Sequence, residues 1–582
     1  MAPLPGEGEP LPEPGWPLPT GPEDPVPGDV TALAWSPDGT WLACQLAPGG
    51  GERTRVRLIS PDGTPRDGET LRELAPDAAA VTLGTWSPNG RQLGITLFTE
   101  GGGEGHACLV DVRDGSSTVL ASGPAARVCA ISGDGRRAVV RLGRRGARSL
   151  ELIDLRSGRR TDLLPGGATV AEARFGVTGD TLYVHTDAGR EHVALLAVTV
   201  HGDAEPPLVH LVAERPDADL DLVALDPAGA RAALVWNVAG VSEAEVLDLR
   251  SGLVDALPDV AGDVVTGAAF TRDGRALLLA AEGPTVAPRI SRVPLDDGGC
   301  ATLPVTLLLG ADTPAGLVAP TLVAYRGEDG LPLQGWLFRP PAALVQHGPL
   351  PTLVWLHGGP EAQERPVFQP LFQALVASGV AVFAPNVRGS GGYGRSFACA
   401  DDRGRRFAAI TDVRATAEHL VAAGLADADR LGVAGRSYGG YLTLVALTWY
   451  PDLFRVGVDV CGMADFDTFY AHTEPWIAEA ATAKYGDPRR DRALLGGLSP
   501  LRRIDRLTAP LMVVHGRHDT NVPVIEAEQV VAALRERGAA PAYLLFDDEG
   551  HEVKDRENRA RFVQEVVAWV TGHLLELGEQ TA

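Results

Sequence analysis

A serine flanked by glycines stands out in the C-terminal half of the chain. The segment Gly435-Arg436-Ser437-Tyr438-Gly439 has the pattern Gly-x-Ser-x-Gly, with the apolar run RLGVA before it and the helix-like run YLTLVALTWY after it. Between a strand and a helix, this pattern forms a turn so sharp that only small residues fit on either side, and the serine hydroxyl is lifted above the sheet. We therefore predict that Ser437 is a nucleophile. The alternative is a purely structural turn.

A serine hydroxyl is a poor nucleophile at neutral pH unless a base takes its proton, and an acid usually orients that base. In hydrolases with this turn, the chain order is serine, acid, histidine. Asp519 follows the apolar run APLMVVHG, and His551 follows the apolar run AYLLF. We expect His551 to be the base and Asp519 its acid. The rivals, which lie too close in sequence to the partner they would need, are Asp547, Asp548, Glu549 and His518.

Attack by the serine creates an oxyanion that needs hydrogen-bond donors. The backbone N–H of Tyr438, directly after the nucleophile, is one predicted donor. The second is expected from the loop His357-Gly358-Gly359-Pro360, where glycines allow the backbone to approach a substrate closely. We favour the N–H of Gly359 over that of Gly358. His357 precedes the serine in the chain, so we expect it to shape this loop and not to act as the base.

Alternating apolar strands and amphipathic helices surround these motifs from about residue 316 to residue 582. This alternation is typical of a parallel sheet covered by helices on both faces, and active sites of such sheets lie at the carboxyl ends of the strands. The sequence therefore predicts a C-terminal α/β-hydrolase catalytic domain over residues 316–582.

A repeated hairpin pattern occupies residues 29–315. Six units share an apolar strand, a tight turn with glycine and a second apolar strand, and their turn glycines, 44 to 51 residues apart, are Gly39, Gly90, Gly135, Gly179, Gly229 and Gly274. Four strands per unit of about 45 residues is typical of a β-propeller blade. A degenerate seventh unit is expected between residue 280 and the domain boundary. A β-sandwich is the alternative, but it has no reason to keep one period over the whole region.

Composition narrows the function classes. The net charge of −23 argues against nucleic-acid binding, which depends on clustered Lys and Arg, and no apolar run is long enough to span a membrane. The six cysteines have no metal-ligand spacing and are expected to be reduced thiols. Residues 1–28 are rich in Pro and Gly and are expected to form an extended arm. With no secretory signal visible, we expect a cytoplasmic protein.

Several longer motifs resemble the prolyl oligopeptidase family of serine peptidases, and above all its acylaminoacyl peptidase (acylpeptide hydrolase) branch. They are HGGP at 357–360, PNVRGSGGYG at 385–394, GRSYGGYLTLVALTWYPDLF at 435–454, HDTNVP at 518–523 and EGH at 549–551. The resemblance implies a seven-bladed propeller that caps the hydrolase site and admits short peptides. It also implies no metal or organic cofactor, and a dimer or larger homo-oligomer.

The resemblance further implies roles for particular residues. The triad falls on Ser437, Asp519 and His551. The aromatic pocket for the side chain on the acyl side of the scissile bond falls after the strand RVGVDVCG, where the candidates are Phe466, Phe469, Tyr470 and Trp476. Aromatic residues at this spacing are also typical of a plain hydrophobic core.

Two departures bear on specificity. Many members carry an arginine two residues beyond the catalytic aspartate, where it binds a substrate carbonyl, whereas this chain has Asn521, which supplies a single uncharged donor. Asparagine at this position occurs in the dipeptidyl-peptidase branch, which grips a free α-amine with a Glu-Glu pair, yet this chain has no Glu-Glu dipeptide. A lone acidic propeller residue could serve instead.

The expected activity is release of N-acylated amino acids from short blocked peptides. The alternatives are a dipeptidyl-peptidase- or carboxypeptidase-like member of the same family, an esterase or amidase acting on a small peptide-like metabolite, and a propeller scaffold with an inactive hydrolase domain. A carboxypeptidase-like specificity would require an Arg or Lys facing the cavity.

Overall fold

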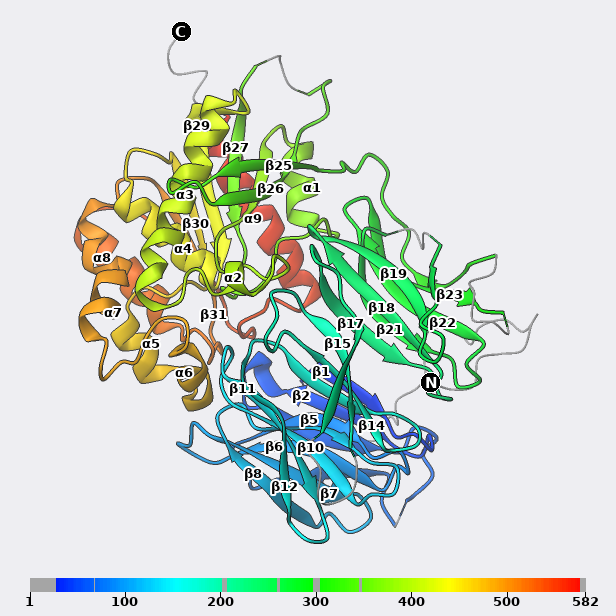
Figure 1. The fold of residues 1–582 in the computed structure, drawn as a ribbon. Coiled ribbons are helices and arrows are strands. Elements are labelled where there is room, and N and C mark those ends of the chain that lie inside the picture. The colour runs from blue at the N-terminus through cyan, green and yellow to red at the C-terminus, as the bar shows by residue number, and fades with distance from the viewer. Residues whose placement is uncertain are drawn as a thin grey trace.

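A computed structural model describes residues 28–66, 68–200, 207–258, 262–296, 304–344 and 348–575 of the chain. The structure has two parts, an all-β part built from the N-terminal half and an α/β part built from the C-terminal half, which lie against each other (Figure 1). The predicted arm at residues 1–28 lies outside the described residues except for Gly28.

The N-terminal part contains six four-stranded antiparallel sheets, each made of four strands consecutive in sequence. The strands of the first three sheets are β1 (Asp29–Trp35), β2 (Leu42–Ala47), β3 (Arg55–Ile59) and β4 (Leu71–Leu74); β5 (Ala80–Trp86), β6 (Gln92–Phe98), β7 (Gly105–Asp111) and β8 (Ser117–Gly123); and β9 (Arg127–Ile131), β10 (Arg137–Leu142), β11 (Arg148–Asp154) and β12 (Arg160–Ala168). The strands of the other three are β13 (Ala171–Phe175), β14 (Thr181–Thr186), β15 (Ala194–Thr199) and β16 (Leu208–Ala213); β17 (Asp219–Leu225), β18 (Arg231–Val238), β19 (Val241–Asp248) and β20 (Val254–Ala256); and β21 (Val264–Phe270), β22 (Ala276–Gly283), β23 (Val286–Pro294) and β24 (Thr306–Gly310).

The hairpin between the first two strands of every sheet contains one of the predicted turn glycines. All six glycines have positive φ, between 65° and 76°, which side chains other than glycine rarely adopt. Hydrophobic clusters are shared between successive sheets; for example, Val235 of β18 and Leu279 of β22 belong to one cluster. Sheets that bury each other's faces in this way are the blades of a β-propeller, as the repeat predicts.

The propeller has six blades among the described residues, not the seven that the resemblance implies. The segment after residue 280, where a seventh unit was expected, contains the end of β22 and the strands β23 and β24, all of the sixth blade. Only ten residues separate Gly310 from Thr321, the start of the next sheet. That is far shorter than the roughly 40–45 residues of a four-stranded blade.

The C-terminal part is built on one eight-stranded sheet with the order β25-β26-β28-β27-β29-β30-β31-β32. Its strands are β25 (Thr321–Arg326), β26 (Pro332–Phe338), β27 (Leu350–Leu356), β28 (Ala381–Asn386), β29 (Ala426–Arg436), β30 (Val456–Val460), β31 (Leu511–Gly516) and β32 (Ala542–Phe546). The first two strands pair antiparallel, and the strands from β28 to β32 are parallel neighbours.

Helices cover both faces of this sheet. They are α1 (Pro370–Ala377), α2 (Arg395–Ala398), α3 (Arg406–Ala422), α4 (Tyr438–Trp449), α5 (Phe466–His472), α6 (Pro475–Ala481), α7 (Arg492–Leu498), α8 (Ile525–Glu536) and α9 (Arg556–Leu574), with short 3-10 helices at Pro48–Gly50, Arg403–Arg405 and Pro500–Arg506. The helices α3, α4 and α8 pack in one hydrophobic cluster, and α1 and α9 pack in a second cluster. None of the helices that the structure describes is both long and apolar enough to cross a membrane.

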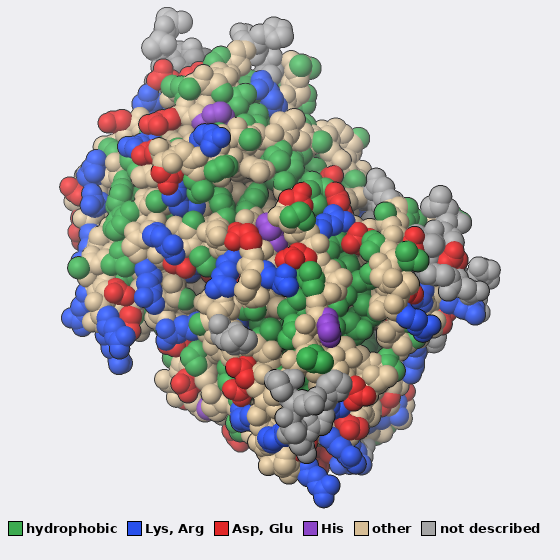
Figure 2. Space-filling model, viewed as in Figure 1, with side chains coloured by type: hydrophobic (Ala, Val, Ile, Leu, Met, Phe, Trp, Pro, Cys, Tyr) green, Lys and Arg blue, Asp and Glu red, His purple; other side chains and the backbone are tan. Residues whose placement is uncertain are grey.

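Polar contacts join the two parts. The guanidinium of Arg365, in the loop before α1, donates to Asp221 Oδ2 at 2.6 Å, to Ser242 Oγ at 2.9 Å and to the carbonyl of Gly240 at 2.8 Å. Nearby, Asn237 of β18 donates to Gln363 at 2.6 Å. On the face seen in Figure 2, acidic and basic side chains are interspersed.

The loop after β28 supports the loop at 357–360 through a buried ion pair. Arg388, of the motif PNVRG, donates to both oxygens of Asp412 on α3 at 2.8 and 2.7 Å, and Asp412 is fully buried. Two residues further along, the Ser390 hydroxyl lies 2.8 Å from His357 Nε2. The ion pair therefore holds the segment on which His357 rests.

We predict that Arg388→Met destabilises the hydrolase domain by about 3 kcal/mol or more, because it leaves the carboxylate of Asp412 buried without a cation. Thermal unfolding followed by circular dichroism measures the effect. Arg414→Met, on the same helix as Asp412, is the matched control. It breaks the exposed pair with Glu328 and is expected to cost no more than about 1 kcal/mol. Equal shifts for both variants would contradict the prediction.

Candidate active site

Ser437 occupies a strained turn between β29 and α4. Its backbone has φ 56° and ψ −116°, a conformation that costs a residue with a side chain roughly 1–3 kcal/mol. The turn is held because the Ser437 N–H donates to the Val460 carbonyl at 2.8 Å. A Cβ on Gly439 would overlap the Leu356 carbonyl oxygen, and one on Gly435 would overlap the carbonyl oxygen of Gly439. Both glycines of the motif are therefore required by close backbone packing.

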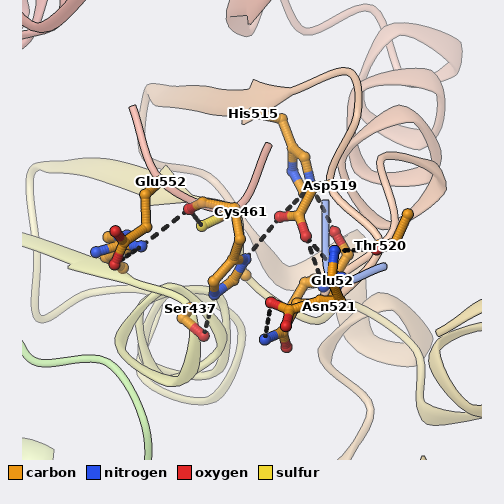
Figure 3. Close-up of polar contacts among 12 residues, drawn as sticks. Glu52, Ser437, Cys461, His515, Asp519, Thr520, Asn521 and Glu552 are labelled. Atoms are coloured by element: carbon orange, nitrogen blue, oxygen red, sulfur yellow. Dashed lines mark hydrogen bonds and ion pairs between the residues drawn. The ribbon is translucent and has the colours of Figure 1, made fainter. Parts of the chain in front are cut away.

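The structure brings Ser437, His551 and Asp519 into a hydrogen-bonded row. Figure 3 labels the two ends of this row, Ser437 and Asp519. His551 Nε2 lies 3.1 Å from Ser437 Oγ, and His551 Nδ1 lies 2.7 Å from Asp519 Oδ2. The three residues come from the loops that follow β29, β32 and β31, all at the carboxyl edge of the parallel strands. A serine, a histidine and a carboxylate in this geometry can transfer a proton from the hydroxyl to the imidazole.

Asp519 is held ionised by its surroundings. Its Oδ1 accepts the backbone N–H groups of Asn521 and Val522, each at 2.9 Å, while Oδ2 faces His551 and lies 3.4 Å from His515 Nε2. Burial by itself would raise the pKa of this carboxyl. The two histidines have the opposite and larger effect, and together they hold its pKa well below the usual range.

The same pair shifts His551 in the opposite sense. Burial favours the neutral imidazole, but the adjacent Asp519 carboxylate stabilises the imidazolium more, so the pKa of His551 lies well above 6.5. The site is therefore built to accept a proton at His551. None of the rival acids near His551 takes this place; Asp547 instead pairs with Arg517 at 2.6 Å.

The segments that carry the predicted oxyanion donors flank the hydroxyl. Tyr438 is the first residue of α4, so its N–H has no acceptor within the helix. Gly358 lies close to Ser437: a Cβ added to this glycine would be 3.5 Å from Ser437 Cβ. Gly359 has φ 51° and lines the cavity over Ser437 that is described below. His357 is buried, and its ring nitrogens lie 2.8 Å from Ser390 Oγ and 3.0 Å from the Gly358 carbonyl oxygen, so it contacts its own loop and the segment after β28.

A cavity of about 800 Å³ opens over Ser437 between the two domains. Of the predicted pocket residues, Phe469, Trp476 and Asn521 line it. Phe466 and Tyr470 do not line it. Phe466 is buried beneath and packs on Tyr485, with ring centroids 4.9 Å apart, and the Tyr470 hydroxyl donates to the Gly486 carbonyl at 2.9 Å.

Sequence reasoning missed several lining residues. Met463, Ile477 and Tyr485 complete the apolar wall around Phe469 and Trp476. Aromatic and aliphatic residues in this segment give no signal that separates a pocket from a core. Only the packing of α5 and α6 around the cavity makes the distinction.

The propeller contributes a carboxylate that the sequence could not place. Glu52, between β2 and β3, accepts a hydrogen bond from Asn521 Nδ2 at 3.1 Å, and its backbone N–H donates to Thr520 Oγ1 at 3.0 Å (Figure 3). Among the described residues, no basic side chain pairs with Glu52, whereas its neighbour Arg53 pairs with Glu100 and Glu474. An unpaired negative charge therefore lies beside Asn521.

Among the residues that the structure describes, one set of side chains has the spacing to hold a metal ion. Cys461, Asp519 and His551 offer ligand atoms within 4.8 Å of one another. Asp519 and His551 are already engaged with each other in the row described above, and Cys461 is buried beside them. The expectation of a reaction without a metal or an organic cofactor stays a prediction.

Comparison with known proteins identifies relatives of both parts. The sequence model of the prolyl oligopeptidase family matches residues 366–576. Dipeptidyl aminopeptidase BIII of Pseudoxanthomonas mexicana is 31% identical over 416 residues, which cover 68% of this chain and 58% of the relative. Acylamino-acid-releasing enzyme 2 of Oryza sativa subsp. japonica is 26% identical over 38% of this chain and 30% of the relative. The matched region thus spans less than two thirds of the length of these relatives.

Solved structures resemble the whole fold. A puromycin-hydrolyzing peptidase of Mycobacterium tuberculosis superposes with a TM-score of 0.78 over 94% of this chain and 86% of that one, at 20% identity. An acylaminoacyl peptidase superposes with a TM-score of 0.66 over 94% and 89%, at 18% identity. These structures establish the shared architecture of propeller and hydrolase. The sequence matches, above all that of the family model over residues 366–576, show that the hydrolase domain of this chain belongs to the prolyl oligopeptidase family of peptidases.

Proposed function

We propose that the protein is a serine peptidase that cleaves short peptides through an acyl-enzyme formed on Ser437. The observation that carries this proposal is the alignment of Ser437 Oγ, His551 and Asp519 at 3.1 and 2.7 Å. His551 takes the hydroxyl proton as Ser437 Oγ attacks the peptide carbonyl carbon. It then gives that proton to the nitrogen of the leaving amine as the C–N bond breaks. Water, activated by the same histidine, hydrolyses the ester and frees Ser437.

Two backbone N–H groups, of Tyr438 and Gly359, are proposed to bind the oxyanion that forms in both steps. Donors of this kind act when they are fixed in advance, so that they need no rearrangement as the charge develops. The strained turn at Ser437 and the buried support of His357 by Ser390 supply that rigidity.

The domain arrangement supports a preference for short peptides. The cavity over Ser437 is bounded by hydrolase residues on one side and by propeller residues such as Phe98 and Pro124 on the other. A folded protein cannot enter a space of about 800 Å³, whereas a few residues of an extended peptide can. Phe469, Trp476 and Tyr485 favour a large apolar side chain on the acyl side of the scissile bond.

For the position of cleavage, we propose that the substrate carries a free α-amine and that a dipeptide is released. If Asn521 holds a substrate carbonyl, as its place two residues beyond Asp519 implies, the amino group of the first substrate residue falls near Glu52. A carboxylate without a cationic partner is suited to bind an ammonium group. The similarity to a dipeptidyl aminopeptidase supports this choice.

The alternative is the acylated peptide. The similarity to an acylamino-acid-releasing enzyme favours it, and Asn521 keeps one amide hydrogen with which to hold the carbonyl of a blocked residue. A blocked amine carries no charge, so Glu52 would add nothing to its binding. The role of Glu52 therefore separates the two activities.

Paired p-nitroanilides test this choice. Glycyl-leucyl- and acetyl-leucyl-p-nitroanilide are incubated with the wild type and with Glu52→Gln, which keeps the acceptor oxygen but loses the charge. We expect the wild type to prefer the free amine. Glu52→Gln should lower kcat/KM for that substrate about ten- to hundredfold, because it removes a charge-assisted hydrogen bond. It should leave the acetylated one unchanged.

The Ser437→Ala variant gives the background rate. A wild-type preference for the acetylated compound, with no effect of Glu52→Gln, would establish the acyl-releasing alternative. If neither p-nitroanilide is cleaved while p-nitrophenyl acetate is still hydrolysed through Ser437, the result would indicate an esterase or amidase and would contradict the peptidase proposal.

The pH profile tests the proposed base. Only neutral His551 can accept the serine proton, so kcat/KM should rise with pH through the pKa of His551 in the free enzyme. Because Asp519 raises that pKa, the midpoint of the acidic limb should lie above 6.5. Asp519→Asn removes the charge and should move the midpoint down, since burial then dominates, while kcat falls by about 10⁴.

The control is His518→Gln, adjacent to Asp519 in sequence but outside the hydrogen-bonded row. It is expected to leave the midpoint in place. A wild-type midpoint below 6.5, or a midpoint that Asp519→Asn does not move, would show that His551 is not the group that titrates.

A further inference from the structure

One propeller hairpin brings three arginines to the wall of the catalytic cavity. The loop between β10 and β11 has the sequence GRRGA at 143–147, and Arg144, Arg145 and Arg148, the last at the start of β11, all line the cavity over Ser437. Pro124 and Ala125, from the loop between β8 and β9, lie beside them in the same wall. The hairpin faces the hydrolase side of the cavity, where Glu361 and Glu479 also line it.

The lining of the cavity is more basic than the rest of the chain. Five basic side chains and three carboxylates line it, in a protein whose net charge is −23. Four of the basic groups have carboxylate partners: Arg144 with Glu479, Arg145 with Glu361, Arg436 with Glu552 and Lys484 with Asp401. Among the residues that the structure describes, Arg148 is the lining cation for which no carboxylate lies within ion-pair distance.

Arg148 is also poorly satisfied as a hydrogen-bond donor. One guanidinium nitrogen, Nη1, donates to the carbonyl of Thr169, in the connection between β12 and β13, at 2.5 Å. Its Nε is buried and has no acceptor among the described residues. Burial, with the like charges of Arg141 and Arg145, lowers the pKa of Arg148 to about 10, so the guanidinium is still charged at neutral pH. A desolvated cation of this kind gains strongly from an added anion.

We propose that Arg148 binds a carboxylate of the peptide held in the cavity. This inference rests on the proposed peptidase function and adds a second determinant of specificity to it. The carboxylate has two sources, the C-terminus of a short substrate and an acidic side chain. A guanidinium suits both, because its planar array of donors matches a carboxylate.

Glu52 is hydrogen-bonded to the lining residue Asn521, so the site would then have one unpaired charge of each sign, Glu52 beside the cavity and Arg148 in its wall. A short peptide with free ends carries the complementary pair, an ammonium and a carboxylate. Attraction at both ends favours such a peptide over a segment of a longer chain, whose ends lie elsewhere. In a protein this acidic, a carboxylate is repelled at long range, so a local cation in the cavity is needed to retain it.

Four peptides with the same first two residues test the proposal: glycyl-leucyl-alanine, its C-terminal amide, glycyl-leucyl-glutamate amide and glycyl-leucyl-glutamine amide. Release of glycyl-leucine is followed by chromatography. For wild type we expect a higher kcat/KM for the acid than for the amide of the first pair, or for the glutamate than for the glutamine peptide of the second. Arg148→Met should reduce that ratio about ten- to hundredfold.

The pair whose ratio falls identifies the source of the carboxylate. The uncharged amides should be cleaved by Arg148→Met at the wild-type rate, which also shows that the variant is folded. Arg148→Lys keeps the charge without the planar fork and should restore part of the ratio. The double variant Arg144→Gln/Glu479→Gln, which removes a neutralised pair from the same wall, should leave the ratios unchanged.

Equal ratios in wild type and Arg148→Met for both pairs would overturn the inference, as would an equal loss of rate for charged and uncharged peptides. Binding to Ser437→Ala, measured by calorimetry, separates this result from a failure of the proposed function. Tighter binding of a carboxylate peptide that disappears in Ser437→Ala/Arg148→Met supports the inference even if the wild type does not cleave it. Cleavage without any preference for a carboxylate supports the peptidase alone.

Discussion

The sharp turn at Ser437 is the constraint on which the rest of the site depends. Its backbone conformation is unfavourable for any residue with a side chain, and it persists because the surrounding strands leave no room to relax. Gly439 lies against the Leu356 carbonyl of β27, and Gly440 lies against Asp459 of β30. Three neighbouring strands and one helix therefore fix the position of a single hydroxyl. This packing places Ser437 Oγ where a base can reach it from the far strands of the sheet.

The two partners of the serine are fixed by a different device. His551 and Asp519 lie in loops, and loops are mobile unless their polar groups are satisfied. Asp519 is held by two backbone N–H groups of its own loop and is buried, so its carboxylate acts as a fixed negative charge. That charge orients His551 and makes it a stronger base. The orientation of the His551 ring and its raised pKa thus have the same cause, the buried carboxylate of Asp519.

The propeller places two charged groups in or beside the cavity. Its first blade places Glu52 against Asn521, and its third blade places Arg148 in the cavity wall. Neither residue has an oppositely charged partner among the described residues, whereas the charged groups around them are largely paired. Arg148 is largely buried, where an unpaired charge is costly, and a ligand of opposite charge would remove that cost. The catalytic groups therefore come from one domain, and the charges proposed to select substrates come from the other.

The sequence by itself determined the features that depend on local backbone demands. Glycines with positive φ mark the hairpin between the first two strands of each described blade, and the close packing of the serine turn demands the glycines of its motif, so both could be recognised along the chain. The chain order serine, acid, histidine then identified Asp519 and His551 as the candidates.

The tertiary structure alone decided the features that depend on packing between segments distant in sequence. Six blades are found among the described residues because β23 and β24, in the region expected to hold a seventh unit, complete the sixth blade. Phe466 lies in the core, whereas Tyr485 lines the cavity. Glu52 and Asn521 are 469 residues apart, so no local pattern relates them. Arg148 resembles every other propeller arginine until the fold shows which charges are already paired.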